Sequence, residues 1–193
     1  MRGAIFIIDN GGQYVHRIWR SFRELGVLSK IIPNNLLPSD LKERKTVGFV
    51  LSGGPYIENS GNSELFLEYA INNEIPILGI CLGHQIIGKY FGAEVSRGAK
   101  AEYGITEIKI LENDLLFRGI PSKIRAWASH MDEVKTIPEN FVLTATSEIC
   151  LIESMRHKKL PIFGVQFHPE VTHTEYGKDI LRNFYEISLR YIE

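Results

Sequence analysis

The first half of the chain alternates between short apolar runs and amphipathic segments. Apolar runs at residues 4–8, 47–51 and 77–80 predict β-strands that are covered on both faces, and residues 28–32 are also expected to form a strand. Between them, apolar side chains recur at helical spacing over residues 15–25 and 65–70, which predicts two helices. Strands that alternate with helices indicate a parallel, doubly wound sheet, in which ligands bind at the carboxyl ends of the strands.

The pattern changes after Gly92. Short apolar alternations at residues 105–110, 124–127, 142–145 and 150–152 predict strands with no crossing helix between them, and therefore an antiparallel extension of the sheet. Residues 161–166 return to the buried sheet, and a last amphipathic helix is expected from about Lys178. We expect one α/β domain over residues 1–193: a doubly wound, mostly parallel sheet with helices on both faces and an antiparallel extension in the second half.

Composition and charge narrow the class of protein. The 193 residues, 44% of them hydrophobic, are enough for one core of ordinary size. A net charge of −1 gives no reason to expect a nucleic acid or an anionic membrane as partner, and no apolar run is long enough to span a bilayer. Two cysteines do not make a disulfide framework, so we expect a protein of the reducing cytoplasm.

Cys81 stands where a buried strand turns into a helix. The strand runs into Gly79-Ile80-Cys81-Leu82-Gly83, and a helical pattern follows at once. Flanking glycines around such a residue are typical of a nucleophile elbow, with sulfur here in place of the serine oxygen. A helix N-terminus also favours the thiolate. The alternative is that Cys81 is a small buried hydrophobic residue, as most free cysteines are.

His168 and Glu170 follow another buried strand, in Gly164-Val165-Gln166-Phe167-His168-Pro169-Glu170. Residues two apart in an extended chain point the same way, so both side chains can face one side of the sheet. A carboxylate beside an imidazole fixes its tautomer and stabilises the imidazolium, and a cysteine nucleophile needs such a base. His16 and His157 are expected at the surface.

An acyl-transfer site also needs hydrogen-bond donors for the oxyanion. The N–H group of Leu82, directly after Cys81, is one candidate. Gly53 and Gly54, at the end of the preceding strand, are a second, because glycine lets the backbone approach a substrate closely. The alternative for this segment is a plain turn.

A metal site is the less favoured interpretation of the polar residues in the second half. The spacing of the candidate ligands matches no helical zinc motif, and Pro169 argues against a helix there. These candidates are His130, Asp132, His168, Glu170 and His173. We expect no metal, and we expect Cys150 to be a core residue.

Three motifs together resemble the class I glutamine amidotransferase family. They are Gly79–Gln85, Gln166–Glu170 and Leu51–Pro55, which match the family's elbow, its His-Pro-Glu segment and its oxyanion strand. The resemblance implies that Cys81, His168 and Glu170 form the catalytic triad of a glutaminase and that Gly54 and Leu82 form the oxyanion hole. It also implies glutamine contacts, which it places at Gly53, Gln85, Ser129, His130 and Met131.

Within that family, the closer resemblance is to the GMP synthase branch, carried by residues 23–27, 102–104, 129–134 and 171–177. Many fused members have glycine where this chain has Met131, which weakens the expected backbone contact to glutamine. The resemblance implies a heterodimer in which a separate ATP-pyrophosphatase (synthetase) subunit receives the ammonia. ATP and Mg²⁺ would then belong to that partner, with no cofactor on this chain.

Three other functions stay open from the sequence. One is the glutaminase subunit of a different amidotransferase. A second is another cysteine hydrolase or peptidase of the same architecture. The third is a non-catalytic subunit that only regulates a synthetase, which would not need Cys81, His168 and Glu170 together.

Overall fold

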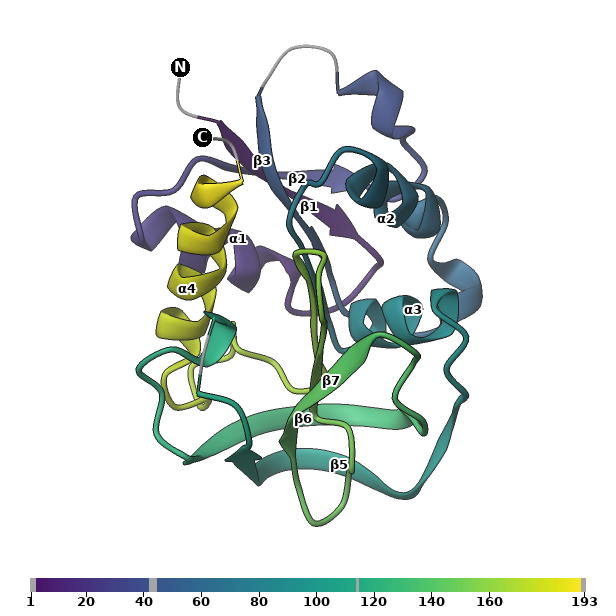
Figure 1. Ribbon diagram of the computed structural model, residues 1–193, viewed down its shortest axis with the longest axis vertical. Helices are drawn as coiled ribbons and strands as arrows, with labels where there is room; N and C mark the ends of the chain where they lie inside the picture. Colours follow the sequence, from purple (N-terminus) through teal and green to yellow (C-terminus); the bar gives the residue numbers. More distant parts are fainter. Residues whose placement is uncertain (1–2, 42–44, 114, 192–193) are drawn as a thin grey trace.

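The computed structural model, which describes residues 3–41, 45–113 and 115–191, contains a nine-stranded mixed sheet (Figure 1). The expected domain limits at residues 1 and 193 lie outside the described residues. The strand order is β2-β1-β3-β4-β9-β8-β7-β5-β6. The strands are β1 (Ala4–Asp9), β2 (Ser29–Pro33), β3 (Thr46–Leu51), β4 (Ile77–Ile80), β5 (Val95–Ile110), β6 (Lys123–Val134), β7 (Phe141–Thr146), β8 (Ser154–His157) and β9 (Ile162–Val165).

The sheet has a parallel half and an antiparallel half. β2, β1, β3, β4 and β9 pair parallel with one another, and β1, β3, β4 and β9 are apolar runs of the sequence. β8, β7, β5 and β6 pair antiparallel. The parallel sheet with an antiparallel extension is therefore confirmed.

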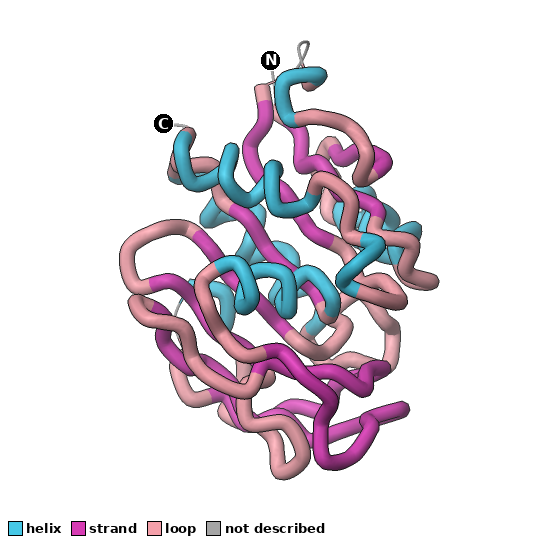
Figure 2. Tube along the Cα trace, turned by 90° about the vertical axis from the view of Figure 1, so that its right-hand side faces the viewer, coloured by secondary structure: helices cyan, strands magenta, loops and turns pink. Residues whose placement is uncertain are grey.

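Four helices cover the parallel half, two on each face. α1 (Val15–Glu24) and α4 (Gly177–Arg190) lie on one side, and α2 (Ser63–Asn72) and α3 (Leu82–Tyr90) on the other (Figures 1 and 2). Two hydrophobic clusters match these faces, one centred on residues such as Ile18, Phe22 and Phe184, the other on residues such as Phe66 and Ile86. Short 3₁₀ turns occur at Pro38–Asp40, Ile57–Asn59 and Leu115–Phe117.

One expected strand is wrong. Residues 150–152 are apolar but form a bend, and the strand in this region, β8, begins at Ser154. The bend is stabilised by Ser147, whose hydroxyl accepts the Cys150 N–H at 2.9 Å and whose own N–H donates to the Cys150 carbonyl at 2.9 Å. Cys150 is fully buried, as expected, but in a turn rather than in a strand.

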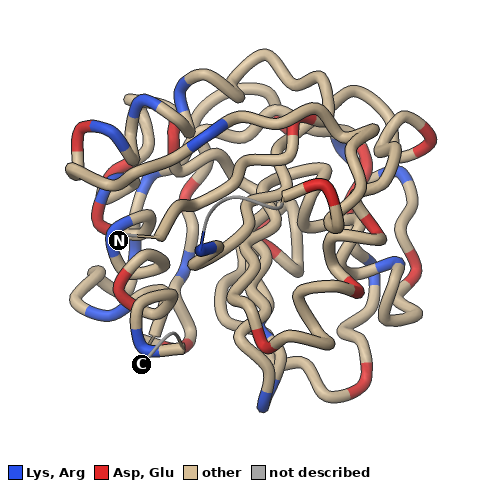
Figure 3. Tube along the Cα trace, turned by 90° about the horizontal axis from the view of Figure 1, so that it is seen from above, with Lys and Arg blue, Asp and Glu red and all other residues tan. Residues whose placement is uncertain are grey.

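Charges of both signs are spread over the molecule (Figure 3), in keeping with the net charge of −1. In the described part of the chain, no helix has the length and apolar character needed to cross a membrane.

The turn from β4 into α3 depends on two close backbone approaches. A Cβ on Gly79 would collide with the backbone of Gly83, and a Cβ on Gly83 would collide with the carbonyl group of Leu51 on β3. The glycines on either side of Cys81 therefore allow α3 to pack directly on the ends of β3 and β4.

Glu153 is a buried carboxyl group in the antiparallel half. It is fully buried, and neither carboxyl oxygen has a hydrogen-bond partner among the described residues. Burial, reinforced by the nearby charge of Glu102, raises the pKa of Glu153 from 4.5 to about 8. The group is therefore neutral in the folded protein at neutral pH.

Replacing Gly83 with alanine should destabilise the fold by about 1–3 kcal/mol, because the backbone of Leu51 cannot move aside without disturbing β3. Gly88→Ala on the same helix is the matched control. The three atoms nearest to its Cβ belong to the side chains of Val134 and Met155 rather than to the backbone, so Gly88→Ala should lose less stability than Gly83→Ala. Urea unfolding of both variants measures the difference, and equal losses would contradict this account of the turn.

Glu153 should make folding stability fall as the pH rises from 4.5 to about 8, because the unfolded chain loses this proton over that range while the folded chain keeps it. Glu153→Gln should remove this part of the pH dependence. Its stability relative to wild type should rise by at least about 1 kcal/mol across the window. Denaturant unfolding at several pH values measures the effect. The exposed Glu148→Gln serves as control and should leave the slope unchanged.

Candidate active site

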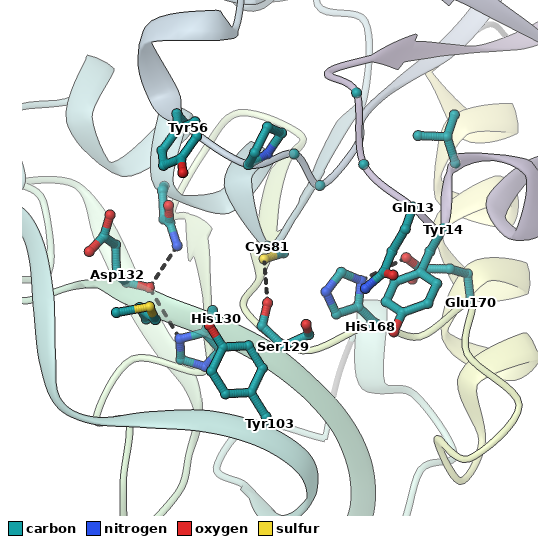
Figure 4. Close-up of a pocket in the computed structure, with 18 of the residues that line it drawn as sticks. Gln13, Tyr14, Tyr56, Cys81, Tyr103, Ser129, His130, Asp132, His168 and Glu170 are labelled. Carbon is teal, nitrogen blue, oxygen red and sulfur yellow. Dashed lines mark hydrogen bonds and ion pairs between the residues drawn. The ribbon is translucent and has the colours of Figure 1, made fainter.

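The carboxyl ends of β1, β3, β4 and β9 open into one cavity of about 570 Å³, a size typical of small-molecule sites. Its opposite wall comes from β5 and β6 (Figure 4). The cavity is lined by residues 11–15, Gly53–Tyr56, Cys81, Gln85, Arg97, Tyr103, Ser129–Asp132, His168 and Glu170. The sites expected from separate parts of the sequence thus lie in one pocket.

Cys81 occupies the tight turn between β4 and α3. Its φ of +52° and ψ of −104° form a backbone conformation that residues with a side chain rarely adopt. Such strained turns are typical of nucleophile elbows. The residue is only 6% exposed and reaches the pocket, where Sγ lies 3.8 Å from the Ser129 carbonyl oxygen. The alternative of a mere packing residue does not explain the strain.

His168 and Glu170 form a buried pair beside Cys81. His168 Nδ1 lies 2.8 Å from Glu170 Oε1, and both side chains are almost fully buried. Burial alone disfavours a charged imidazole, but the Glu170 carboxylate and the Cys81 sulfur outweigh it and raise the pKa of His168 well above its ordinary value. The imidazole is therefore held in its protonated form. Its Nδ1 contacts Glu170, which leaves Nε2 as the nitrogen that can exchange a proton with a bound molecule.

The main chain of His168 is fixed by the loop that follows it. The Thr174 hydroxyl donates to the His168 carbonyl at 2.7 Å and accepts the Trp127 N–H at 2.9 Å. The His168 N–H donates to the Trp127 carbonyl at 2.9 Å. His173 packs on the Trp127 ring with 5.4 Å between ring centroids. The His168–Glu170 pair is thus anchored to β6 as well as to β9.

Tyr14 is a pocket residue that the sequence analysis missed. Its ring meets the His168 ring edge to face at 4.9 Å, and its hydroxyl accepts the Trp127 indole N–H at 3.1 Å. Tyr14 follows Gly11-Gly12, just after the end of β1. Its place after the carboxyl end of a parallel strand is the sequence feature that could have indicated a pocket residue. Arg97, which belongs to none of the motifs, and Tyr103, from the segment 102–104 of the resemblance, also line the pocket.

The expected oxyanion residues lie next to the sulfur. A Cβ on Gly53 would lie 3.2 Å from His168 Cε1 and 3.6 Å from Cys81 Cβ. A Cβ on Gly54 would collide with Asn10 and with the Leu82 side chain. Leu82 opens α3, where the first N–H groups have no intrahelical partner. The Leu82 N–H group, directly after the residue that carries the sulfur, therefore has no partner within its helix.

The residues expected to contact glutamine all line the pocket, with Gly53 and Ser129 close to the sulfur. The Gln85 amide donates to the Asp132 carbonyl at 2.7 Å. The Ser129 carbonyl faces the sulfur, and Met131 lies with its sulfur 4.0 Å from the Arg97 guanidinium. His130 is buried in the pocket wall, and its Nε2 lies 2.8 Å from the buried Glu102 carboxylate.

One group of side chains in the described part of the chain has potential metal-ligand atoms close together. It comprises Glu102, His130 and Cys150, whose ligand atoms lie within 4.8 Å of one another. His130 is already bound on both nitrogens, by Glu102 at 2.8 Å and by the Asp132 carbonyl at 3.1 Å. Burial raises the pKa of the Cys150 thiol, which is fully buried. We assign this cluster to the support of the pocket wall.

Comparison with known proteins agrees with this geometry. The family model described as "Glutamine amidotransferase class-I" matches residues 6–187. A Pyrococcus abyssi protein, named as one subunit of a glutamine-hydrolyzing GMP synthase, is 61% identical over 180 residues, covering 93% of this chain and 96% of that protein. The Pyrococcus furiosus protein of the same name is 58% identical over 183 residues, covering 95% and 97%.

Solved structures extend the comparison. A Thermoplasma acidophilum protein, described as the same GMP synthase subunit, superposes with a TM-score of 0.92 at 43% identity, covering 100% of this chain and 96% of that one. A Thermotoga maritima glutamine amidotransferase shares the fold, with a TM-score of 0.79 at 21% identity and coverage of 100% and 99%. The chain belongs to the class I glutamine amidotransferase family.

Proposed function

We propose that this chain is the glutamine-hydrolysing subunit of a two-subunit GMP synthase. The observation that carries the proposal is Cys81 on its strained turn, in one pocket with the His168–Glu170 pair. The Pyrococcus relatives match nearly the whole chain, and their names support GMP synthase rather than another amidotransferase.

The first half of the reaction forms a thioester. The Cys81 sulfur attacks the side-chain amide carbon of glutamine, and the C–N bond breaks in the tetrahedral intermediate. The oxyanion accepts hydrogen bonds from the N–H groups of Gly54 and Leu82. His168, held protonated by Glu170, gives its proton to the leaving nitrogen, so that ammonia departs as a neutral molecule.

The second half returns the enzyme to its starting state. His168, now neutral, takes a proton from water, which attacks the thioester carbon. Glutamate leaves as the carbon–sulfur bond breaks. Glu170 keeps Nδ1 of the imidazole occupied throughout, so that the opposite nitrogen faces the reacting atoms.

The pocket also accepts the amino-acid end of glutamine. Gly53, Gln85, Ser129, His130 and Met131 line it, and they offer backbone and amide groups for a zwitterion. The charged side chains of Arg97 and Asp132 lie at the same wall, on paired positions of β5 and β6. These groups fix the substrate so that only its amide reaches Cys81.

The ammonia is consumed by a separate ATP-pyrophosphatase subunit, which forms a heterodimer with this chain and converts XMP to GMP. ATP and Mg²⁺ act on that subunit. A regulatory subunit without catalysis is the competing interpretation. A thiol-alkylating glutamine analogue distinguishes the two, since labelling at Cys81 supports the amidotransferase and no labelling in the presence of the partner supports the regulator.

Cys81→Ala should abolish glutamine-dependent GMP formation by the two-subunit complex while ammonia-dependent formation persists. The alanine keeps the backbone turn and removes only the nucleophile. The measurement is GMP production from XMP and ATP with glutamine or with ammonium as the nitrogen source. Retained glutamine hydrolysis would overturn the role of Cys81, and loss of both activities would point to a damaged complex.

His168→Ala should lower the kcat of glutamine hydrolysis by at least about a hundredfold, because proton transfer has no substitute in the pocket. Glu170→Gln should cost less, since the loop around Thr174 still holds the His168 main chain. Steady-state ammonia release measures both. Equal losses, or the reverse order, would show that the roles of acid and orienting group are wrongly assigned.

A further inference from the structure

Gln166 lies directly beside the nucleophile and has no role in the steps above. It follows β9, whose last residue, Val165, accepts the Cys81 N–H at 2.8 Å. The Gln166 side chain is fully buried, and its Nε2 lies 3.6 Å from Cys81 Sγ, within hydrogen-bond distance for sulfur. A buried amide at this position places an N–H donor on the reacting atom.

The orientation of this amide is dictated by its neighbours. The Asp132 carbonyl can only accept, so Gln85 must turn its NH₂ group toward it, at 2.7 Å. The same NH₂ group donates to Gln166 Oε1 at 3.3 Å. With its oxygen committed to Gln85, Gln166 directs its own NH₂ group to the sulfur. Reversal of either amide would set two donors or two acceptors against each other.

The two uncharged contacts of the sulfur favour opposite protonation states. The Ser129 carbonyl can only accept, so it favours the S–H form, whereas the Gln166 amide donates and favours the thiolate. His168 with Glu170, and the N-terminus of α3, also favour the thiolate. The other titratable or charged groups that line the pocket are Tyr14, Tyr56, Arg97, Tyr103, His130 and Asp132.

We propose that Gln166 is a further catalytic residue, whose amide N–H stabilises the Cys81 thiolate and which Gln85 aligns from the Asp132 carbonyl. The proposal rests on the nucleophilic role of Cys81 proposed above. The Asp132 carbonyl, Gln85, Gln166 and the Cys81 sulfur form a chain of hydrogen bonds, here called the amide relay. Gln85 therefore has a second role besides contact with glutamine, since it fixes the direction of these hydrogen bonds.

The test is the rate at which iodoacetamide alkylates Cys81, followed by mass spectrometry of the Cys81 peptide. Gln166→Leu removes the donor and should slow alkylation at pH 7 about tenfold, with recovery toward the wild-type rate at alkaline pH, where the thiol ionises without help. Gln166→Glu should be slower still at pH 7, because a carboxylate would face the sulfur. Gln85→Leu should have a smaller effect, since it only frees the Gln166 amide to turn.

Asn183→Leu is the matched control. It removes another buried amide, which donates to the carbonyls of Leu116 and Arg118 beside α4. It should reduce stability while leaving Cys81 alkylation unchanged. Cys150, buried and protonated, provides the slow internal reference in every sample.

Two results would overturn the proposal. One is a wild-type rate of alkylation in Gln166→Leu at pH 7, and the other is a loss that persists equally at alkaline pH, which would indicate altered packing. A wild-type Cys81 that reacts no faster than Cys150 at pH 7 would instead remove the nucleophilic role of Cys81, and with it the basis for the relay. Failure of the relay and failure of the proposed function are thus distinguished within one experiment.

Discussion

The backbone of Cys81 is the constraint on which the site depends. A residue with φ near +52° costs about 1–3 kcal/mol and persists only where its surroundings hold it. Here a sheet bond to Val165 holds its N–H, and the Gln85 N–H at 3.1 Å holds its carbonyl. Gly79 and Gly83 let the two layers close around the turn. The core therefore stores strain at the turn that directs the Cys81 side chain out of the sheet and into the pocket.

Burial is the second condition that the site needs. His168 and Glu170 come from a loop, yet they are as buried as core residues, because β6, the Thr174 hydroxyl and the Tyr14 ring enclose them. In such surroundings a carboxylate and an imidazole interact more strongly than in water. In an exposed pair of the same residues, the pKa of the histidine would stay close to its ordinary value.

Much of this could be predicted from sequence, because buried parallel strands are apolar throughout and end at polar residues. This pattern pointed to Gly53, Cys81 and His168. Because β3, β4 and β9 are parallel neighbours, their carboxyl ends lie at the same edge of the sheet, which brings these residues together. The pattern failed at residues 150–152, because a buried turn held by Ser147 has the same apolar composition as a strand. Tyr14 follows the end of β1, but the contacts that bring its ring to His168 involve Trp127, which is distant in sequence. The direction of an amide such as Gln166 depends on a carbonyl on another strand, which no local pattern encodes.

The antiparallel hairpin of β5 and β6 has a further consequence for how such a protein diverges. It joins the rest of the sheet through two residue pairs with β7, at Lys109 and Ile110, whereas its pocket end lies around Arg97 and Asp132. Substitutions at the exposed positions of that end can reshape what the cavity admits without touching the turn that holds the sulfur. A new specificity can therefore arise through exposed side chains of the hairpin, while the backbone carbonyls of β6 at Trp127, Ser129 and Asp132 keep the chemistry in place.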